Sequence, residues 1–163
     1  MMGTVASMRL TLAAVGRAKP GSSRELFEDY VARLRRGPLG PLTLKEVEVR
    51  RTLPPAELKR HEAELLLGAV PQGARLIALD ERGKALDSAG FARLLGRWRD
   101  GGVREAAFVI GGADGLDESV REAADVVLSL GPMTWPHLLV RVLLAEQLYR
   151  AQSILTGHPY HRE

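Results

Sequence analysis

The chain lacks cysteine, has few aromatic residues and contains no long hydrophobic run. None of its 163 residues is Cys, and 5% are Phe, Trp or Tyr. The missing thiols exclude a disulfide scaffold, a Cys-ligated zinc or iron–sulfur site and thiolate catalysis. The low aromatic content disfavours an RNA-binding platform of stacking side chains. The best apolar run, residues 138–144, contains Arg141 and is far shorter than the roughly 20 residues of a membrane span, so we predict no membrane-spanning segment.

Positive charge is concentrated in the first part of the chain. Residues 1–100 hold 18 Lys and Arg against 12 Asp and Glu, whereas residues 101–163 hold 5 against 8. We therefore expect a polyanion to meet the first part. Each basic cluster alone is typical of a solvated helix face, but together they permit a track for a phosphate backbone. The clusters are Arg33, Arg35 and Arg36; Arg50 and Arg51; Lys59 and Arg60; and Arg93, Arg97 and Arg99.

Residues 1–7 are expected to form a disordered extension before one domain that spans residues 8–163. The start of the chain fits neither a myristoylation site, because Met1 and Met2 both precede Gly3, nor a signal peptide, because a basic region and a cleavage site are missing. We expect the protein in the cytoplasm.

Hydrophobic periodicity predicts strands that alternate with helices. Strands are expected at 9–15, 42–49, 74–79, 106–110 and 126–130, and a polar turn at 80–84. Helices are expected at 22–34, from Pro54 onward, and at 88–99, 117–124 and 136–155, with Ser22 and Thr134 as possible N-caps. This alternation is typical of the α/β class, with a mainly parallel sheet and helices on both faces.

Two loops follow predicted strands and are candidates for a ligand pocket. Residues 111–115 read Gly-Gly-Ala-Asp-Gly, and ligands of open α/β sheets bind beyond the carboxyl ends of strands. The loop matches neither a P-loop nor a dinucleotide fingerprint, and the alternative is a tight turn with positive φ at two or three positions. Residues 130–137 form the second loop, where Met133 and Trp135 suit a flat, partly polar ligand such as an adenosine.

The C-terminal tail concentrates groups that transfer protons or contact anions. Residues 158–163 contain two His, one Tyr, one Arg and one Glu, and three of the four His of the chain lie beyond residue 136. His137 has a plain alternative role, a local bond at a helix start. His158 and His161 do not suggest a metal site, because Pro159 prevents a shared helical face and no carboxylate is suitably spaced; we predict no metal.

The last predicted helix is apolar on most of its sides. A helix of this kind is buried on most sides, and in a small domain a second copy of the chain is a natural cover. We therefore predict a homodimer with Arg141, Glu146 and Arg150 near its interface. Glu146 and Arg150 have the i,i+4 spacing of a helical ion pair.

Three segments together resemble a known family. Residues 108–116, 136–151 and 158–163 closely resemble the bacterial ribosomal RNA large subunit methyltransferase H family, and the resemblance covers the chain from Met8 onward. It implies a SPOUT-type α/β fold with a C-terminal trefoil knot, a homodimer, and S-adenosyl-L-methionine held by the knot loops. It also implies methylation of N3 of a pseudouridine in 23S rRNA of the assembled 70S ribosome.

The resemblance also implies roles for particular residues. Cofactor contacts are expected from Leu79, Gly111, Leu130, Gly131, Pro132, Met133, Thr134 and Trp135. Tyr160, His161 and Arg162 of the tail are expected near the target base, supported by His137 and Arg150. We assign proton handling to His161 or Tyr160, and stabilisation of the anion to Arg162 or Arg150. Two alternatives stay open: a knotted methyltransferase acting on tRNA, and a non-catalytic ribosome-binding factor.

Overall fold

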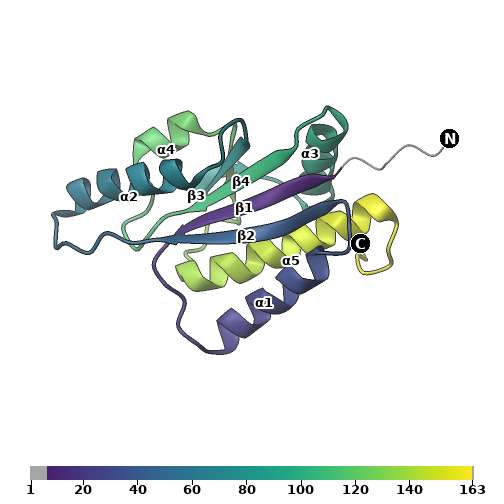
Figure 1. The fold of residues 1–163 in the computed structure, drawn as a ribbon, viewed down its shortest axis with the longest axis horizontal. Helices are drawn as coiled ribbons and strands as arrows, with labels where there is room; N and C mark the ends of the chain where they lie inside the picture. Colours follow the sequence, from purple (N-terminus) through teal and green to yellow (C-terminus); the bar gives the residue numbers. More distant parts are fainter. Residues whose placement is uncertain (1–6, 163) are drawn as a thin grey trace.

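The computed structural model describes residues 7–162 and shows a parallel sheet between two layers of helices (Figure 1). The strands are β1 (Met8–Val15), β2 (Leu39–Val47), β3 (Arg75–Ala85), β4 (Glu105–Ile110) and β5 (Val126–Ser129). The helices are α1 (Ser22–Leu34), α2 (Pro55–Ala69), α3 (Ser88–Asp100), α4 (Glu118–Ala123) and α5 (His137–Thr156). The strand order is β2-β1-β4-β3-β5, and the four neighbouring pairs are parallel. The predicted α/β class and parallel sheet are confirmed.

The described residues do not test every prediction about the fold. The trefoil knot stays a prediction. The expected disordered extension falls, apart from Ser7, on residues that lie outside the described part of the chain. Within residues 7–162, no helix combines the length and the apolar character needed to cross a membrane.

The alternating side chains of β1 explain the two helical layers, because successive residues of a strand point to opposite faces of the sheet. Leu10 and Leu12 belong to a buried cluster with residues of α1, α3 and α5. Ala13 and Val15 belong to a second cluster with residues of α2 and α4. The sheet is therefore covered on both faces, as its apolar strands require.

Several predicted boundaries are wrong. The expected turn at 80–84 lies inside β3, where Leu79 and Lys84 both pair with Leu128, so that the residues between them bulge out of the ladder. Strand β2 begins three residues earlier than predicted, at Leu39. Neither expected N-cap is one: Gly21 precedes α1 and Pro136 precedes α5, and neither helix start has a side-chain cap.

Arg141 of α5 is buried against the ends of two strands. The side chain donates from Nη1 to Glu46 Oε2 of β2 at 2.6 Å, and from Nη2 to the carbonyl oxygens of Val15 and Gly16 at 3.3 and 3.0 Å. Burial alone would raise the pKa of the Glu46 carboxyl, but the bonds from Arg141 and the Ala18 amide and the charges of Arg141 and Arg17 hold it below its usual value. The guanidinium of Arg141 is thus bonded within its own chain, and the position of Arg141 near a dimer interface stays a prediction.

Glu62 of α2 is, like Arg141, a charged residue that is buried. It is 7% exposed, and its Oε1 has no hydrogen-bond partner within the described residues. Burial, reinforced by the negative charge of Asp114, raises the pKa of the Glu62 carboxyl above its usual value. Folding therefore favours the protonated form of this side chain.

We predict that Glu62→Gln removes a loss of stability that sets in as the pH rises. In the unfolded chain Glu62 ionises near pH 4.5, whereas in the folded chain it keeps its proton to higher pH, so the contribution of Glu62 to the stability of the wild type falls as the pH rises between these two values. Gln cannot ionise, and the free energy of unfolding of the variant relative to the wild type should be larger at pH 7 than at pH 4. Urea unfolding at both pH values measures this difference, and an equal difference at pH 4 and pH 7 would contradict the account.

Candidate active site

A cavity of about 780 Å³ opens where β3, β4 and β5 lead into their loops. Its walls come from residues 79–82 of β3, from the glycine loop at 110–116, and from the segment 128–137 with the first turn of α5. Since all the strands are parallel, these loops emerge at the same edge of the sheet. The volume lies within the range of pockets that hold small ligands and cofactors.

The glycine loop needs its glycines more for space than for backbone conformation. A Cβ on Gly111 would lie 2.9 Å from the backbone of Gly115, and a Cβ on Gly112 would lie 2.9 Å from Glu62 Oε2. Only Gly115 has a positive φ among the three, +84°, and its amide donates to the Gly112 carbonyl at 3.0 Å. The expectation of two or three positive φ values is thus wrong, and the loop is a close-packed wall supported from behind by Glu62.

The second loop presents apolar side chains to the cavity. Met133 is 70% exposed and Trp135 is 41% exposed, although both are large hydrophobic residues. Gly131, with a φ of +108°, turns the chain at the start of this loop, and its amide donates to Ser129 Oγ at 3.0 Å. Exposed apolar groups beside loop amides suit a ligand with a flat apolar part and polar edges.

The structure gathers nearly all the predicted cofactor residues around this one cavity. Those that line it are Leu79, Gly111, Leu130, Gly131, Met133, Thr134 and Trp135. Pro132 belongs to the same loop but not to the lining. His137 also lines the cavity, and its Nε2 lies 3.6 Å from the position that a Cβ on Gly16 would take.

Charged residues at the cavity were missed because they were assigned to a turn. Asp80, Glu81 and Arg82 line the cavity from the bulge of β3. Asp80 accepts a hydrogen bond from Arg121 Nη1 of α4 at 3.0 Å, and both side chains are largely buried. In the sequence, residues 80–82 directly follow a buried apolar strand, and this position was the signal that could have identified them. Within residues 7–162, no group of three or more His, Asp or Glu is arranged to hold a metal ion.

The tail folds back on the C-terminal half of α5 and not on this cavity. The Tyr160 hydroxyl donates to Glu146 Oε1 at 3.1 Å and lies 3.3 Å from the Tyr30 hydroxyl of α1. Arg150 pairs with Glu146 at 2.6 Å, which confirms the predicted i,i+4 pair, and its Nη1 lies 3.0 Å from His161 Nδ1. Tyr160, His161, Arg150 and Glu146 therefore form one hydrogen-bonded cluster.

The protonation of this cluster is set by its geometry. Burial raises the pKa of the Tyr160 hydroxyl far above its usual value, and the hydrogen bonds to Tyr30 and Glu146 raise it further. Because an Arg side chain can only donate, His161 Nδ1 accepts, and the proton of the neutral ring is placed on Nε2. In the closed cluster the Tyr160 hydroxyl therefore keeps its proton, and the Nδ1 atom of His161 is occupied by Arg150.

Apart from His137, the predicted catalytic residues are separated from the cofactor cavity along α5. Arg150 follows His137 by 13 residues, which corresponds to about 20 Å at the helical rise of about 1.5 Å per residue. His137 is at the cavity, whereas Arg150, Tyr160 and His161 are at the other end of the helix, and Arg162 is exposed there. One chain therefore brings the cofactor residues together but leaves its own tail away from them.

Comparison with known proteins identifies the family. The family model described as predicted SPOUT methyltransferase matches residues 8–161. Proteins named ribosomal RNA large subunit methyltransferase H are 66% identical in Rhodospirillum centenum, over 95% of this chain and 99% of that protein, and 57% identical in Paramagnetospirillum magneticum, with the same coverage.

Solved structures agree on the fold. A probable methyltransferase from Bordetella pertussis Tohama I has a TM-score of 0.54 at 17% identity, covering 89% of this chain and 96% of that one. A probable methylase family protein from Haemophilus influenzae Rd KW20 has a TM-score of 0.52 at 10% identity, covering 98% of this chain and 72% of that one. With its full-length relatives and its glycine-walled cavity, the chain belongs to the SPOUT methyltransferase family, together with the proteins named ribosomal RNA large subunit methyltransferase H.

Proposed function

We propose that this protein transfers a methyl group from S-adenosyl-L-methionine to N3 of a pseudouridine in 23S rRNA of the assembled ribosome. The observation that carries the proposal is the cavity between the glycine loop and residues 130–135, in a chain 66% identical to a protein named for this RNA. A ribosomal substrate would place the protein in the cytoplasm.

The cavity fits the cofactor by shape and by the chemistry of its walls. Gly111 and Gly112 leave no room for a Cβ, so that backbone forms the wall, as close approach to a ligand requires. The exposed side chains of Met133 and Trp135 offer apolar surface to an adenine ring. S-adenosyl-L-methionine supplies a methyl group on a sulfonium leaving group, and the residues of the cavity need only bind it and orient it toward the incoming nucleophile.

The tail residues supply the chemistry that the target base requires. The N3–H of a pseudouridine must lose its proton before the nitrogen attacks, and the developing anion needs a nearby positive charge. His161 can accept this proton once its bond to Arg150 opens, whereas Tyr160 is held in its protonated form. Arg150 and Arg162 provide the cationic groups beside it.

We further propose a homodimer in which the tail of one chain completes the cavity of the other. The distance of about 20 Å between His137 and Arg150 along α5 keeps each tail away from its own cavity. Leu26 on α1 and Leu139 on α5, neighbouring helices of one face, are 46% and 40% exposed. A two-fold interface on these helices would cover both side chains and bring a second tail within reach.

Methyl transfer to purified RNA targets tests the proposed function. With tritiated S-adenosyl-L-methionine as the methyl donor, we expect label to enter 23S rRNA when the acceptor is 70S ribosomes that lack this modification, with little transfer to tRNA or to free rRNA. Digestion and mass spectrometry should place the label on one pseudouridine. Preferential labelling of tRNA would support the alternative enzyme, and the absence of a heat signal with S-adenosyl-L-methionine in calorimetry would support a binding factor.

Mixing two inactive variants tests the shared site. We expect a chain truncated before Tyr160 to bind S-adenosyl-L-methionine normally but to transfer no methyl group, and Gly111→Ala to lose cofactor binding because its Cβ would meet Gly115. After unfolding and refolding together, about half of the dimers should be mixed, each with one intact site, restoring about a quarter of the wild-type rate. No recovery in the mixture would show that each tail serves its own chain.

A further inference from the structure

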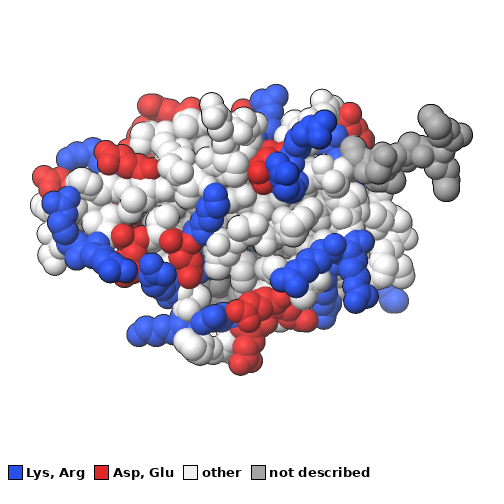
Figure 2. Space-filling view, in the orientation of Figure 1, with Lys and Arg blue, Asp and Glu red and all other residues white. Residues whose placement is uncertain are grey.

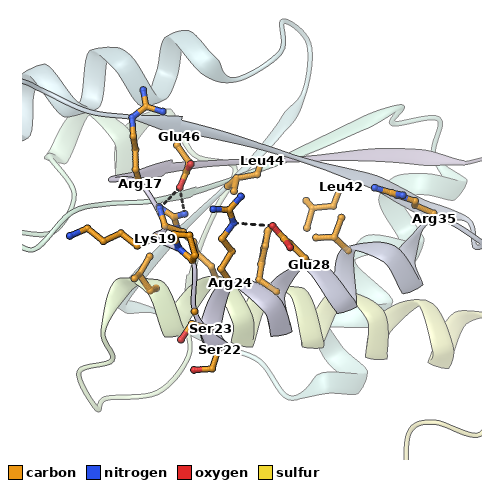
Figure 3. A pocket seen from close by; sticks show the side chains of 17 residues that line it. Arg17, Lys19, Ser22, Ser23, Arg24, Glu28, Arg35, Leu42, Leu44 and Glu46 are labelled. Atoms are coloured by element: carbon orange, nitrogen blue, oxygen red, sulfur yellow. Dashed lines mark hydrogen bonds and ion pairs between the residues drawn. The ribbon is translucent and has the colours of Figure 1, made fainter.

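A second cavity, of about 810 Å³, lies beside the first turn of α5 (Figure 3). It is enclosed by residues 17–24, the inner side of α1, strand β2 and the start of α5. Leu138 and Arg141 line it, whereas His137 and Val140 line the cofactor cavity. The same helical turn therefore separates two neighbouring cavities, and the second one has no role in the reaction described above.

The second cavity carries an excess of positive charge. Its lining contains five cationic side chains, Arg17, Lys19, Arg24, Arg35 and Arg141, and two carboxylates, Glu28 and Glu46. Both carboxylates are neutralised, since Glu46 accepts from Arg141 and Glu28 accepts from Arg24 at 3.0 Å. Among residues 7–162, Lys19 and Arg35 have no ion-pair partner. The cavity therefore favours an anionic occupant.

Part of the cavity wall is apolar. The apolar lining consists of Phe27, Val31, Leu42, Leu44 and Leu138. Apolar walls of a binding pocket suit a ligand with an apolar surface. An occupant that is anionic and also has an apolar surface therefore fits this lining, as a nucleotide does.

The cationic groups are spread along the cavity. Figure 3 shows Arg17 and Lys19 at one end and Arg35 at the other, with Arg24 between them. Arg24 and Arg35 are 11 residues apart, which is about 16 Å along α1. In Figure 2 blue side chains likewise lie at both ends of α1, with red ones between. Successive phosphates of one duplex strand advance about 3.4 Å, so this length suits several linked phosphates better than one.

We propose that the second cavity binds a single-stranded segment of the RNA substrate, with phosphates near Lys19 and Arg35 and a base against the apolar lining. The inference rests on the proposed function in that RNA is the substrate, and it adds where this RNA is held. Proteins hold single strands in positively charged grooves with aromatic side chains on which bases stack, and Phe27 is the aromatic residue of this lining. Leu26 and Leu139, assigned above to the dimer, do not line this cavity.

The test measures binding of the full-length protein to a fluorescein-labelled oligouridylate of about eight nucleotides. We expect the double variant Lys19→Gln, Arg35→Gln to bind roughly tenfold more weakly and to reduce the slope of log K against log salt by about 1.4, because two phosphate contacts are lost. Arg104→Gln is the matched control: Arg104 is exposed and immediately precedes β4, away from the cavity. It should bind the oligonucleotide as the wild type does.

Crosslinking of the wild type provides a second measurement that does not depend on a variant. A 4-thiouridine oligonucleotide should crosslink to peptides containing residues 17–24 or 35–44. Crosslinks confined to other peptides, or equal affinities of the double variant and the wild type, would overturn the proposal. Dissociation of the dimer by the double variant, seen in sedimentation, would also overturn it by assigning the cavity to a second copy of the chain.

Failure of this inference and failure of the proposed function are distinguishable. If the wild type methylates ribosomes while the double variant binds the oligonucleotide normally, only the inference fails. If the wild type transfers no methyl group while the double variant loses RNA binding and crosslinks map to the cavity, only the proposed function fails. Calorimetry with S-adenosyl-L-methionine should give the same affinity for the double variant and the wild type in either case.

Discussion

The guanidinium of Arg141 joins the long helix α5 to the ends of β1 and β2, and both cavities depend on this connection. Its Nη1 and Nη2 groups donate to Glu46 and to two main-chain carbonyls at the sheet edge, and such bonds offset the cost of burying a guanidinium. The first turn of α5 is held against the sheet as a result. His137 and Val140 face the cofactor cavity from this turn, while Leu138 and Arg141 face the second cavity. The contact of Arg141 with the sheet thus positions one wall of each cavity.

The length of α5 is the reason to propose that two chains form the site. Its first turn borders the cofactor cavity, and residues in its C-terminal half bind the tail through Glu146 and Arg150. A straight helix of this length keeps its two ends apart, and the closed tail cluster holds Tyr160 in its protonated form. A second chain, docked on α1 and α5, would resolve both problems by presenting its tail to the cavity. The proposed dimer is therefore a consequence of helix geometry rather than of buried apolar area alone.

Local sequence patterns were sufficient to predict the strands and helices, but not the irregular features that depend on contacts between them. The strands and helices follow from hydrophobic period, and the loops at 111–115 and 130–135 follow from glycine and proline after apolar strands. The bulge at residues 80–83 could not be predicted, because it depends on how β3 pairs with β5. Position 112 requires glycine because a Cβ there would collide with Glu62, which is 50 residues away in the chain. A knot likewise has no local signature, since chains rarely thread their own loops.

Contacts between distant residues also decide the surroundings of the charged groups. Arg141 lies in an apolar stretch and was expected near a dimer interface, and no local pattern indicated its acceptors, which come from β1 and β2, more than 90 residues earlier. The tail was correctly singled out for its composition, yet its contact with Tyr30 has a separation of 130 residues. The second cavity could not be predicted for the same reason, because its cationic side chains come from the loop after β1, from α1 and its C-terminal end, and from α5.

The account assigns the two cavities to different ligands, and a crystal structure of the protein with S-adenosyl-L-methionine tests this assignment most directly. The account predicts the adenine ring between the glycine loop and residues 130–135, beside Met133 and Trp135, with the methyl group open toward the tail of the partner chain. Electron density for the cofactor in the cavity lined by Arg17, Lys19 and Arg35 would contradict the account.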